Sequence, residues 1–115
     1  MRVLAKEWTP TDVFEVLADE YVRAILLTTN IQKRSVADLT NHVDTSQSSL
    51  YRRVDLLVEY NLLQEQTKVD DEGHHYAVYQ PEFSTIDIQL ESNSLIVQID
   101  SSGTDEAQHV EHWTE

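Results

Sequence analysis

The sequence predicts an α+β fold in which three to four helices precede two β-hairpins. Apolar residues recur at spacings of three and four as far as Tyr60, which is the period of an amphipathic helix. From Leu62 onward apolar and polar residues alternate instead, and the clusters 70–73 and 92–94 supply turns between the alternating runs. A length of 115 residues suits one small globular domain.

The first helical region begins in a polar run. Thr9 or Thr11 can cap a helix, and Pro10 favours its first turn. An apolar stripe follows to about Asp19, and helical spacing resumes from 21 to about 28. Two consecutive helical segments are therefore expected before residue 30.

A short helix and a longer one are predicted next. Ser35 is expected to cap a helix of about two turns over 36–43. The polar run 45–46 then caps a longer helix that ends near residue 60. Asn61 is expected to adopt the left-handed conformation that ends many helices.

The rest of the chain reads as strands and a tail. Residues 62–69 and 74–79 form the first hairpin, and 83–90 pairs with 95–100 in the second. Residues 101–115 contain four acids, no Lys or Arg and only Ala107, Val110 and Trp113 as spaced apolar anchors. They are expected to form a tail or a weak terminal helix.

These elements predict four segments. They are an N-terminal arm (1–10), a helical domain with its hairpin (11–80), an accessory β-hairpin packed on that domain or at a dimer interface (81–100) and an acidic tail (101–115). The chain has no cysteine, which excludes disulfides, thiolate metal sites and cysteine nucleophiles. No apolar run approaches the roughly 18–20 residues of a membrane span, and no signal peptide is visible, so a cytoplasmic protein is expected.

The charge is strongly acidic but uneven. The chain carries 21 acidic and 8 basic residues, a formal charge of −13, and such a surface repels phosphate. Residues 31–69 hold five basic and five acidic residues (5 − 5 = 0), whereas the other 76 hold 3 basic and 16 acidic. The bias is explained by a surface adapted to multimolar salt, by a basic partner or by an ordinary acidic composition.

The predicted order of elements is that of a winged helix-turn-helix. In this arrangement a short helix supports a second helix that a DNA major groove can accept, and the hairpin reaches the backbone. Residues 46–57 (SQSSLYRRVDLL) and 59–63 (EYNLL) resemble the recognition helix and wing entry of ArsR- and MarR-type regulators. Asn61 stands where those proteins usually have Gly, and both residues tolerate positive φ. The acidic bias also resembles that of regulators from halophilic archaea.

The resemblance implies a sequence-specific transcription regulator that binds double-stranded DNA as a homodimer. Its recognition helix, about 46–60, would enter the major groove, and its wing, about 62–79, would lie on the backbone. The dimer contact is expected either in the hairpin 83–100 or in the arm and first helix, through Leu4, Trp8 and Phe14. No enzyme activity, catalytic residue or cofactor is expected, and a small-molecule or metal effector is left open.

The candidate DNA-contacting residues are Lys33, Arg34, Ser46, Gln47, Ser48, Tyr51, Arg52, Arg53, Lys68 and His75. Arg52 and Arg53 are expected on the exposed half of the recognition helix, where they can grip guanine or phosphate, and the alternative is pairing with Asp55 or Glu59. Gln47 suits adenine, and Ser46 can instead cap the helix. The acidic turn 70–72 argues against close DNA contact by the wing.

Two segments carry residues that could bind a metal ion. Carboxylates at 70–72 lie beside His74 and His75, and His109 and His112 lie three residues apart. Neighbouring strand residues point to opposite faces, so His74 and His75 are not expected to bind one ion together. No metal site is therefore expected.

A different class of function fits the same fold. A winged helix can serve as a protein–protein interaction module, acting on the transcription machinery or another basic partner without reading DNA. A positive stripe over 46–53 and 68–75 favours DNA, and a continuous negative surface favours a protein partner.

Overall fold

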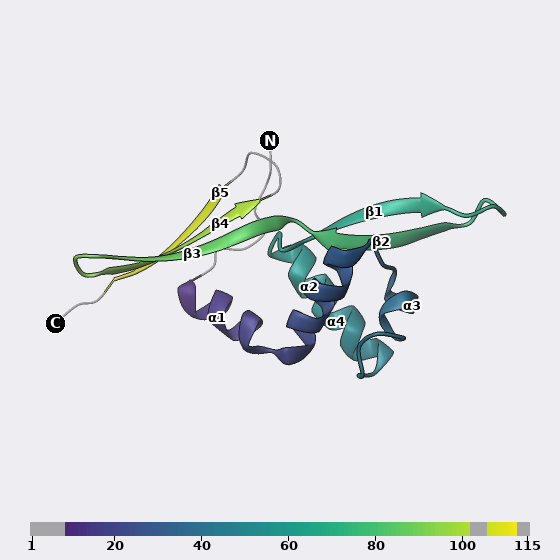
Figure 1. The fold of residues 1–115 in the computed structure, drawn as a ribbon, viewed down its shortest axis with the longest axis horizontal. Coiled ribbons are helices and arrows are strands. Elements are labelled where there is room, and N and C mark those ends of the chain that lie inside the picture. Colours follow the sequence, from purple (N-terminus) through teal and green to yellow (C-terminus); the bar gives the residue numbers. More distant parts are fainter. Residues whose placement is uncertain (1–8, 102–105, 113–115) are drawn as a thin grey trace.

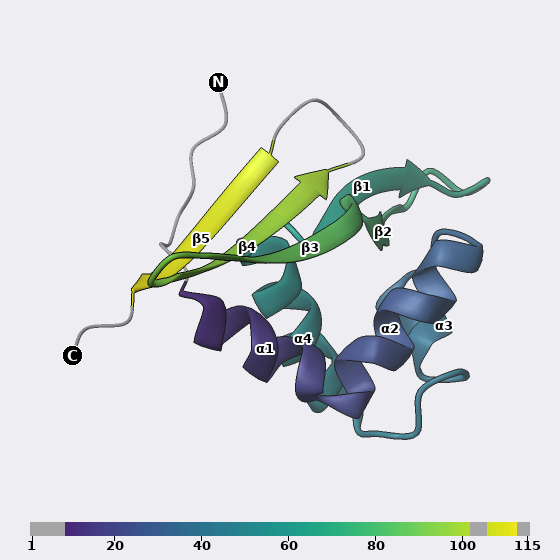
Figure 2. The ribbon, with the colours of Figure 1, turned by 60° about the vertical axis from the view of Figure 1, so that its left-hand side comes forward.

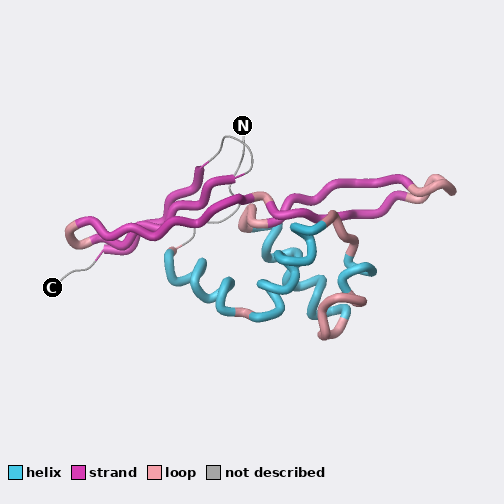
Figure 3. The backbone as a smooth tube through the Cα atoms, viewed as in Figure 1, coloured by secondary structure: helices cyan, strands magenta, loops and turns pink. Residues whose placement is uncertain are grey.

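The computed structural model describes residues 9–101 and 106–112, which form an α+β fold with four helices and two small antiparallel sheets (Figures 1 and 3). The helices are α1 (Pro10–Ala18), α2 (Glu20–Ile31), α3 (Val36–Leu39) and α4 (Gln47–Glu59). The strands are β1 (Leu63–Val69), β2 (His75–Pro81), β3 (Phe83–Glu91), β4 (Ser94–Ser101) and β5 (Glu106–His112). One sheet has the order β1-β2 and the other β3-β4-β5.

The first two helices meet at one aspartate. Thr9 caps α1 in a capping box, since its hydroxyl accepts from the Asp12 N–H (3.3 Å) and the Asp12 carboxylate accepts from the Thr9 N–H (3.0 Å). Asp19 ends α1, and its carboxylate accepts from the Tyr21 N–H (2.9 Å) as the cap of α2. The predicted cap at Thr9 is confirmed, Pro10 belongs to α1 rather than to an arm, and α2 runs beyond the predicted end near residue 28.

The helix predicted over 36–43 is shorter than expected. Ser35 caps α3 as predicted: its hydroxyl accepts from the Asp38 N–H (3.1 Å), and the Asp38 carboxylate accepts from the Ser35 N–H (3.3 Å). After Leu39 the chain continues in turns, with Val43 still buried in the core. The apolar spacing thus reports burial correctly while overstating the length of the helix.

The predicted left-handed residue after α4 is confirmed. Asn61 has φ 62°. Its N–H donates to the Val58 carbonyl (3.0 Å), and the Leu62 N–H donates to the Leu57 carbonyl (2.8 Å), which is the paired bonding of a Schellman motif. This turn directs the chain from α4 into β1.

The first hairpin is confirmed and is joined to the helices by a short bridge. Its register runs from Leu63 opposite Pro81 to Val69 opposite His75. Arg34, between α2 and α3, pairs with Tyr79 of β2 through two backbone hydrogen bonds of 3.1 and 2.8 Å. Since Tyr79 also pairs with Glu65 of β1, Arg34 adds a single bridging residue on the other side of β2.

The second hairpin is confirmed, but the prediction for the segment after it is wrong. Residues 106–112, expected in a tail or weak helix, form β5, the third strand of the sheet. Val110 pairs with Ile96 in that ladder. The apolar anchors are spaced three residues apart, as on a helix, but this segment pairs with β4 and is therefore a strand. Leu4, Trp8 and Trp113 lie outside the described residues.

One hydrophobic core joins the helices to the larger sheet. Its members include Val13, Ile25, Leu39, Leu50, Val54, Leu57 and Leu62, together with Val97 and Ile99 of β4. α1 packs against β4 and β5, so the accessory strands pack on the helical domain (Figure 2). The two sheets project from the helices in opposite directions (Figure 1). No helix in the described part of the chain is long and apolar enough to cross a membrane.

Candidate functional site

α4 is held in place by one fully buried face. Leu50, Val54 and Leu57 are each 0% exposed. The Ser46 hydroxyl accepts from the Ser49 N–H (3.2 Å) at the start of the helix, so Ser46 caps α4. A buried side and a capped end fix the orientation of the opposite face.

The opposite face of α4 is polar and free of acid in its first half. Gln47, Ser48, Tyr51 and Arg52 are exposed, and residues 45–54 contain no Asp or Glu. The amino end of a helix carries a positive partial charge, which adds to that of Arg52. This surface can accept a phosphate or a polar base edge in spite of the overall charge.

The two adjacent arginines of α4 differ in role. The Arg53 Nε donates to the Asp19 carboxylate at 2.8 Å, and its guanidinium lies 4.9 Å from the centre of the Tyr21 ring. Its Nη1 also contacts the Ser49 hydroxyl, and its side chain is only 16% exposed. The prediction that Arg53 lies on the exposed half of the helix is wrong: it ties α4 to the junction of α1 and α2.

The same contacts act on Asp19. Burial would raise the pKa of its carboxyl, but the hydrogen bond from Arg53, the one from the Tyr21 N–H and the Arg53 charge outweigh this and lower the pKa. Asp19 is therefore a charged anchor at neutral pH. It lies 34 positions from Arg53, so no local spacing in the sequence could have indicated the pair.

Arg52, in contrast, extends from the surface. The alternative prediction paired it with Asp55 or Glu59, but no carboxylate within residues 9–101 or 106–112 lies within ion-pair distance of it. It lines a hollow of 440 Å³ together with Asp55, Glu59 and Arg53. Arg52 is thus the exposed arginine of α4.

Of the two basic residues before α3, only Lys33 is exposed. Arg34 is 9% exposed; its Nε donates to the Thr28 carbonyl (3.0 Å) and its Nη1 lies 3.0 Å from His42 Nε2. Arg34 was expected to contact DNA and instead connects α2, the turn after α3 and the hairpin. A buried arginine with backbone partners cannot also reach a ligand without breaking them.

The hairpin candidates lie on opposite faces. Lys68 is opposite Tyr76, whereas His75 is opposite Val69, and consecutive strand residues alternate between faces. Both are exposed, but His75 shares its face with Tyr79, which packs on the helices, and Lys68 faces away from them. One flat surface therefore cannot engage both.

The hairpin turn is ordered and acidic. The Asp70 carboxylate accepts from the N–H groups of Glu72 (2.9 Å) and His74 (2.8 Å). His74 Nδ1 lies 3.4 Å from the Asp70 carboxylate and 3.6 Å from that of Glu72. The turn is thus closed by its own carboxylate, and Asp71 and Glu72 extend from it.

A groove of 440 Å³ separates the hairpin from α3 and α4. Ala37, Tyr51, His74, Tyr76 and Tyr79 are among its lining residues. The Tyr79 hydroxyl donates to the Glu65 carboxylate (3.1 Å), and burial together with this carboxylate raises the pKa of Tyr79 to about 12. Tyr76 and Tyr79 were not predicted as site residues. Residues three apart in a strand point to opposite faces, so the sequence gave no reason to place both beside one groove.

The histidines and carboxylates do not assemble a metal site in the part of the chain that the structure describes: no group of three or more is placed to hold an ion. His112 Nδ1 lies 2.8 Å from the Ser94 hydroxyl. His109 is opposite Val97 on the other face of the sheet, so the two histidines of β5 point apart.

Comparisons with protein-family models, with curated proteins and with solved structures found no match to this chain. The function is therefore inferred from the geometry of α3, α4 and the β1–β2 hairpin.

Proposed function

We propose that the chain is a winged helix-turn-helix regulator of transcription, of the ArsR- and MarR-like type that its sequence resembles. In this proposal α4 enters the major groove of double-stranded DNA and reads its sequence, and the β1–β2 hairpin is the wing. The observation that carries the proposal is the polar, acid-free face of the first half of α4, which is held outward by a face with three side chains at 0% exposure.

Each exposed residue of that face has a chemistry suited to DNA. Arg52 can donate two hydrogen bonds to guanine, and Gln47 can pair with adenine in the same way. Ser48 can donate to phosphate at the helix start, and Tyr51 (48% exposed) can contact phosphate or a thymine methyl. Lys33, before α3, and Lys68, in the hairpin, are exposed cations on the elements next to α4 in sequence.

The acidic charge constrains how this binding works. High salt weakens attraction to phosphate, and a chain of charge −13 gains little from it in any case. Base contacts and shape must then carry most of the affinity. A single helix of this size rarely suffices, so a homodimer that reads two half-sites is part of the proposal.

A second function is favoured by one observation. Asp70, Asp71 and Glu72 lie exposed at the tip of the hairpin, where a DNA-binding wing would meet phosphate. This acidic tip suits a basic protein partner, for which the winged helix would be an interaction module.

Selection from a random double-stranded DNA library with the whole purified chain, in low and in molar KCl, tests both functions. We expect enrichment of a pseudo-palindromic motif. Arg52→Gln should weaken binding to it by about 1–3 kcal/mol. Arg23→Gln is the matched control, because Arg23 is an exposed helical arginine on α2. It should leave binding unchanged.

The opposite result is equally informative. No enriched motif at either salt concentration, or a motif that binds Arg52→Gln and wild type alike, overturns DNA reading by α4. Retention of the chain on a basic protein matrix through Asp71 and Glu72, without any DNA motif, would favour the interaction module.

A further inference from the structure

β3 is an open edge of the larger sheet. Within residues 9–101 and 106–112 no strand pairs with its outer side, since the sheet order is β3-β4-β5. α1 covers the β4 and β5 side of the helix-facing surface, so Val97 of β4 is 0% exposed. On the same face of β3, Ile88 is 58% and Leu90 is 80% exposed.

Beyond the register shift between Phe83 and Thr85 at its start, this edge lacks the features with which proteins usually protect open strands. Residues 83–91 contain no Lys, Pro or Gly, and their only charged residues, Asp87 and Glu91, lie on the face opposite Ile88. The helix-facing side of β3 is thus apolar on a chain that is otherwise strongly acidic. A long, apolar, unpaired edge favours pairing with another strand.

We propose that β3 pairs antiparallel with β3 of a second copy of this chain, about a two-fold axis at Ile88, so that two three-stranded sheets become one of six strands. This names the interface of the homodimer that the proposed function requires. The two copies would continue each other's apolar face beside α1.

Charge disfavours the two neighbouring registers. With the axis at Ile88, the facing pairs are Ile88 with Ile88, Ile86 with Leu90, Asp87 with Gln89 and Thr85 with Glu91, each taken from the two copies. No carboxylate then faces another. An axis at Asp87 would place two aspartates opposite each other, and an axis at Gln89 would place Asp87 opposite Glu91, which is unfavourable.

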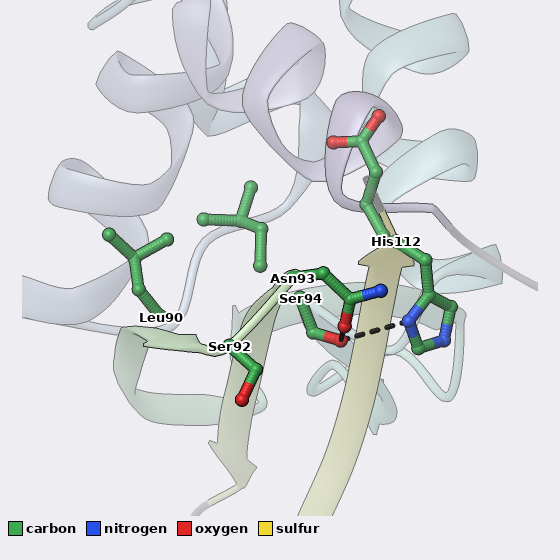
Figure 4. A pocket seen from close by; sticks show the side chains of 7 residues that line it. Leu90, Ser92, Asn93, Ser94 and His112 are labelled. Carbon is green, nitrogen blue, oxygen red and sulfur yellow. Dashed lines mark hydrogen bonds between the residues drawn. The ribbon is translucent and has the colours of Figure 1, made fainter. Parts of the chain in front are cut away.

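A second copy of the chain is the partner of this edge because the edge is complementary to itself. A two-fold interface uses the same patch on both partners, and this register pairs Ile86, Ile88 and Leu90, the apolar residues of the helix-facing side, with one another. Leu90 and Leu95 also line a hollow of 630 Å³ at the open end of the sheet (Figure 4). Ile86 of the second copy would lie opposite Leu90, at the edge of that hollow.

Cross-linking tests the geometry directly, because the chain has no cysteine of its own. Facing residues of an antiparallel pair have Cα atoms about 4.5–5.5 Å apart, within the reach of a disulfide. We expect Ile88→Cys to form a disulfide-linked dimer under mild oxidation. Val69→Cys, in a strand of the hairpin at 57% exposure against 58% for Ile88, should remain a monomer on a denaturing gel.

Sedimentation without DNA then tests the register. Gln89→Lys creates two Lys–Asp87 pairs and should tighten the dimer about fivefold, whereas Gln89→Glu should weaken it about fivefold. Ile88→Lys should abolish the dimer, and Val69→Lys should not. A wild-type chain that stays monomeric in both low and molar KCl overturns the proposal, as does a dimer that none of these changes affects. Because no DNA is present, such a failure is separate from a failure of DNA binding.

Discussion

The two sheets project from the helices in opposite directions, and they are built differently (Figure 1). In the hairpin, residues 67–76 are all exposed, and only its base is buried, through Leu63, Val78 and Tyr79. In the larger sheet one face enters the core through Val97 and Ile99, and the other carries Asp87, Glu91 and Asp100.

The larger sheet therefore contributes mainly to folding stability, whereas the exposed part of the hairpin is available for binding. A strand with no buried face contributes little to folding beyond its base, so its residues can change for the benefit of a ligand. A strand that completes the core cannot change in this way, and its free edge is the part left for a partner. The hairpin therefore suits a polar partner beside α4, and the larger sheet suits an apolar one.

The same substitution in the two sheets gives the largest expected contrast. Val97→Ala removes two methyl groups from a side chain at 0% exposure and should lower the free energy of unfolding by about 2–3 kcal/mol. Val69→Ala, at 57% exposure in the hairpin, should change it by less than about 0.5 kcal/mol. Urea denaturation measures both, and equal losses would show that the sheets do not differ in this way.

Tyr79, at the base of the hairpin, should make the stability of the fold depend on pH in the alkaline range. The pKa of Tyr79 is raised to about 12, above its usual value in the unfolded chain, so its stabilising effect is complete below about pH 10. As pH rises from about 10 to 12, the unfolded chain loses the proton first, and the wild type should lose about 2 kcal/mol more than Tyr79→Phe does. The exposed Tyr76→Phe is the control, measured by urea denaturation across this range, and should follow the wild type.

How much of this could be read from the sequence depends on distance along the chain. The caps at Thr9 and Ser35 and the left-handed Asn61 are local, because each depends on residues within four positions, and all three were predicted. β5 was missed because its identity depends on pairing with β4, and the weak apolar pattern of 106–112 has no strand period of its own.

In the candidate site, too, local features were predicted and features that depend on distant residues were not. That α4 has an inner and an outer face follows from helical spacing, and Arg52 is exposed as expected. Arg53 and Arg34 were misjudged because their partners, Asp19 and the Thr28 and Tyr79 backbone, come from other elements. Spacing places a residue on a face, but only tertiary structure supplies its partner.

Substituting each arginine of α4 in turn tests whether one stabilises the fold while the other is free to bind DNA. Arg53→Ala leaves the partly buried Asp19 without its cation and should lower the free energy of unfolding by about 1–2 kcal/mol. Because the pKa of Asp19 is lowered in the folded chain, its contribution is present above its unfolded pKa and is lost as pH falls through the folded one. Arg53→Ala should therefore be less sensitive to acid than the wild type. Arg52→Ala should unfold like the wild type across that pH range, and an equal loss in both variants would contradict the division.

The smallest expected effect concerns the acidic turn. If the hairpin lies near phosphate, Asp71→Asn removes a repulsion and should tighten DNA binding about twofold at moderate salt, with the gain shrinking as salt screens it. Glu111→Gln makes the same change of charge on the other sheet, on β5 at the edge farthest from β3, and should leave DNA affinity unchanged. Fluorescence anisotropy with the selected motif measures both. Equal gains would mean that net charge governs binding, and a gain confined to Asp71 would place the hairpin, and not the larger sheet, beside the DNA backbone.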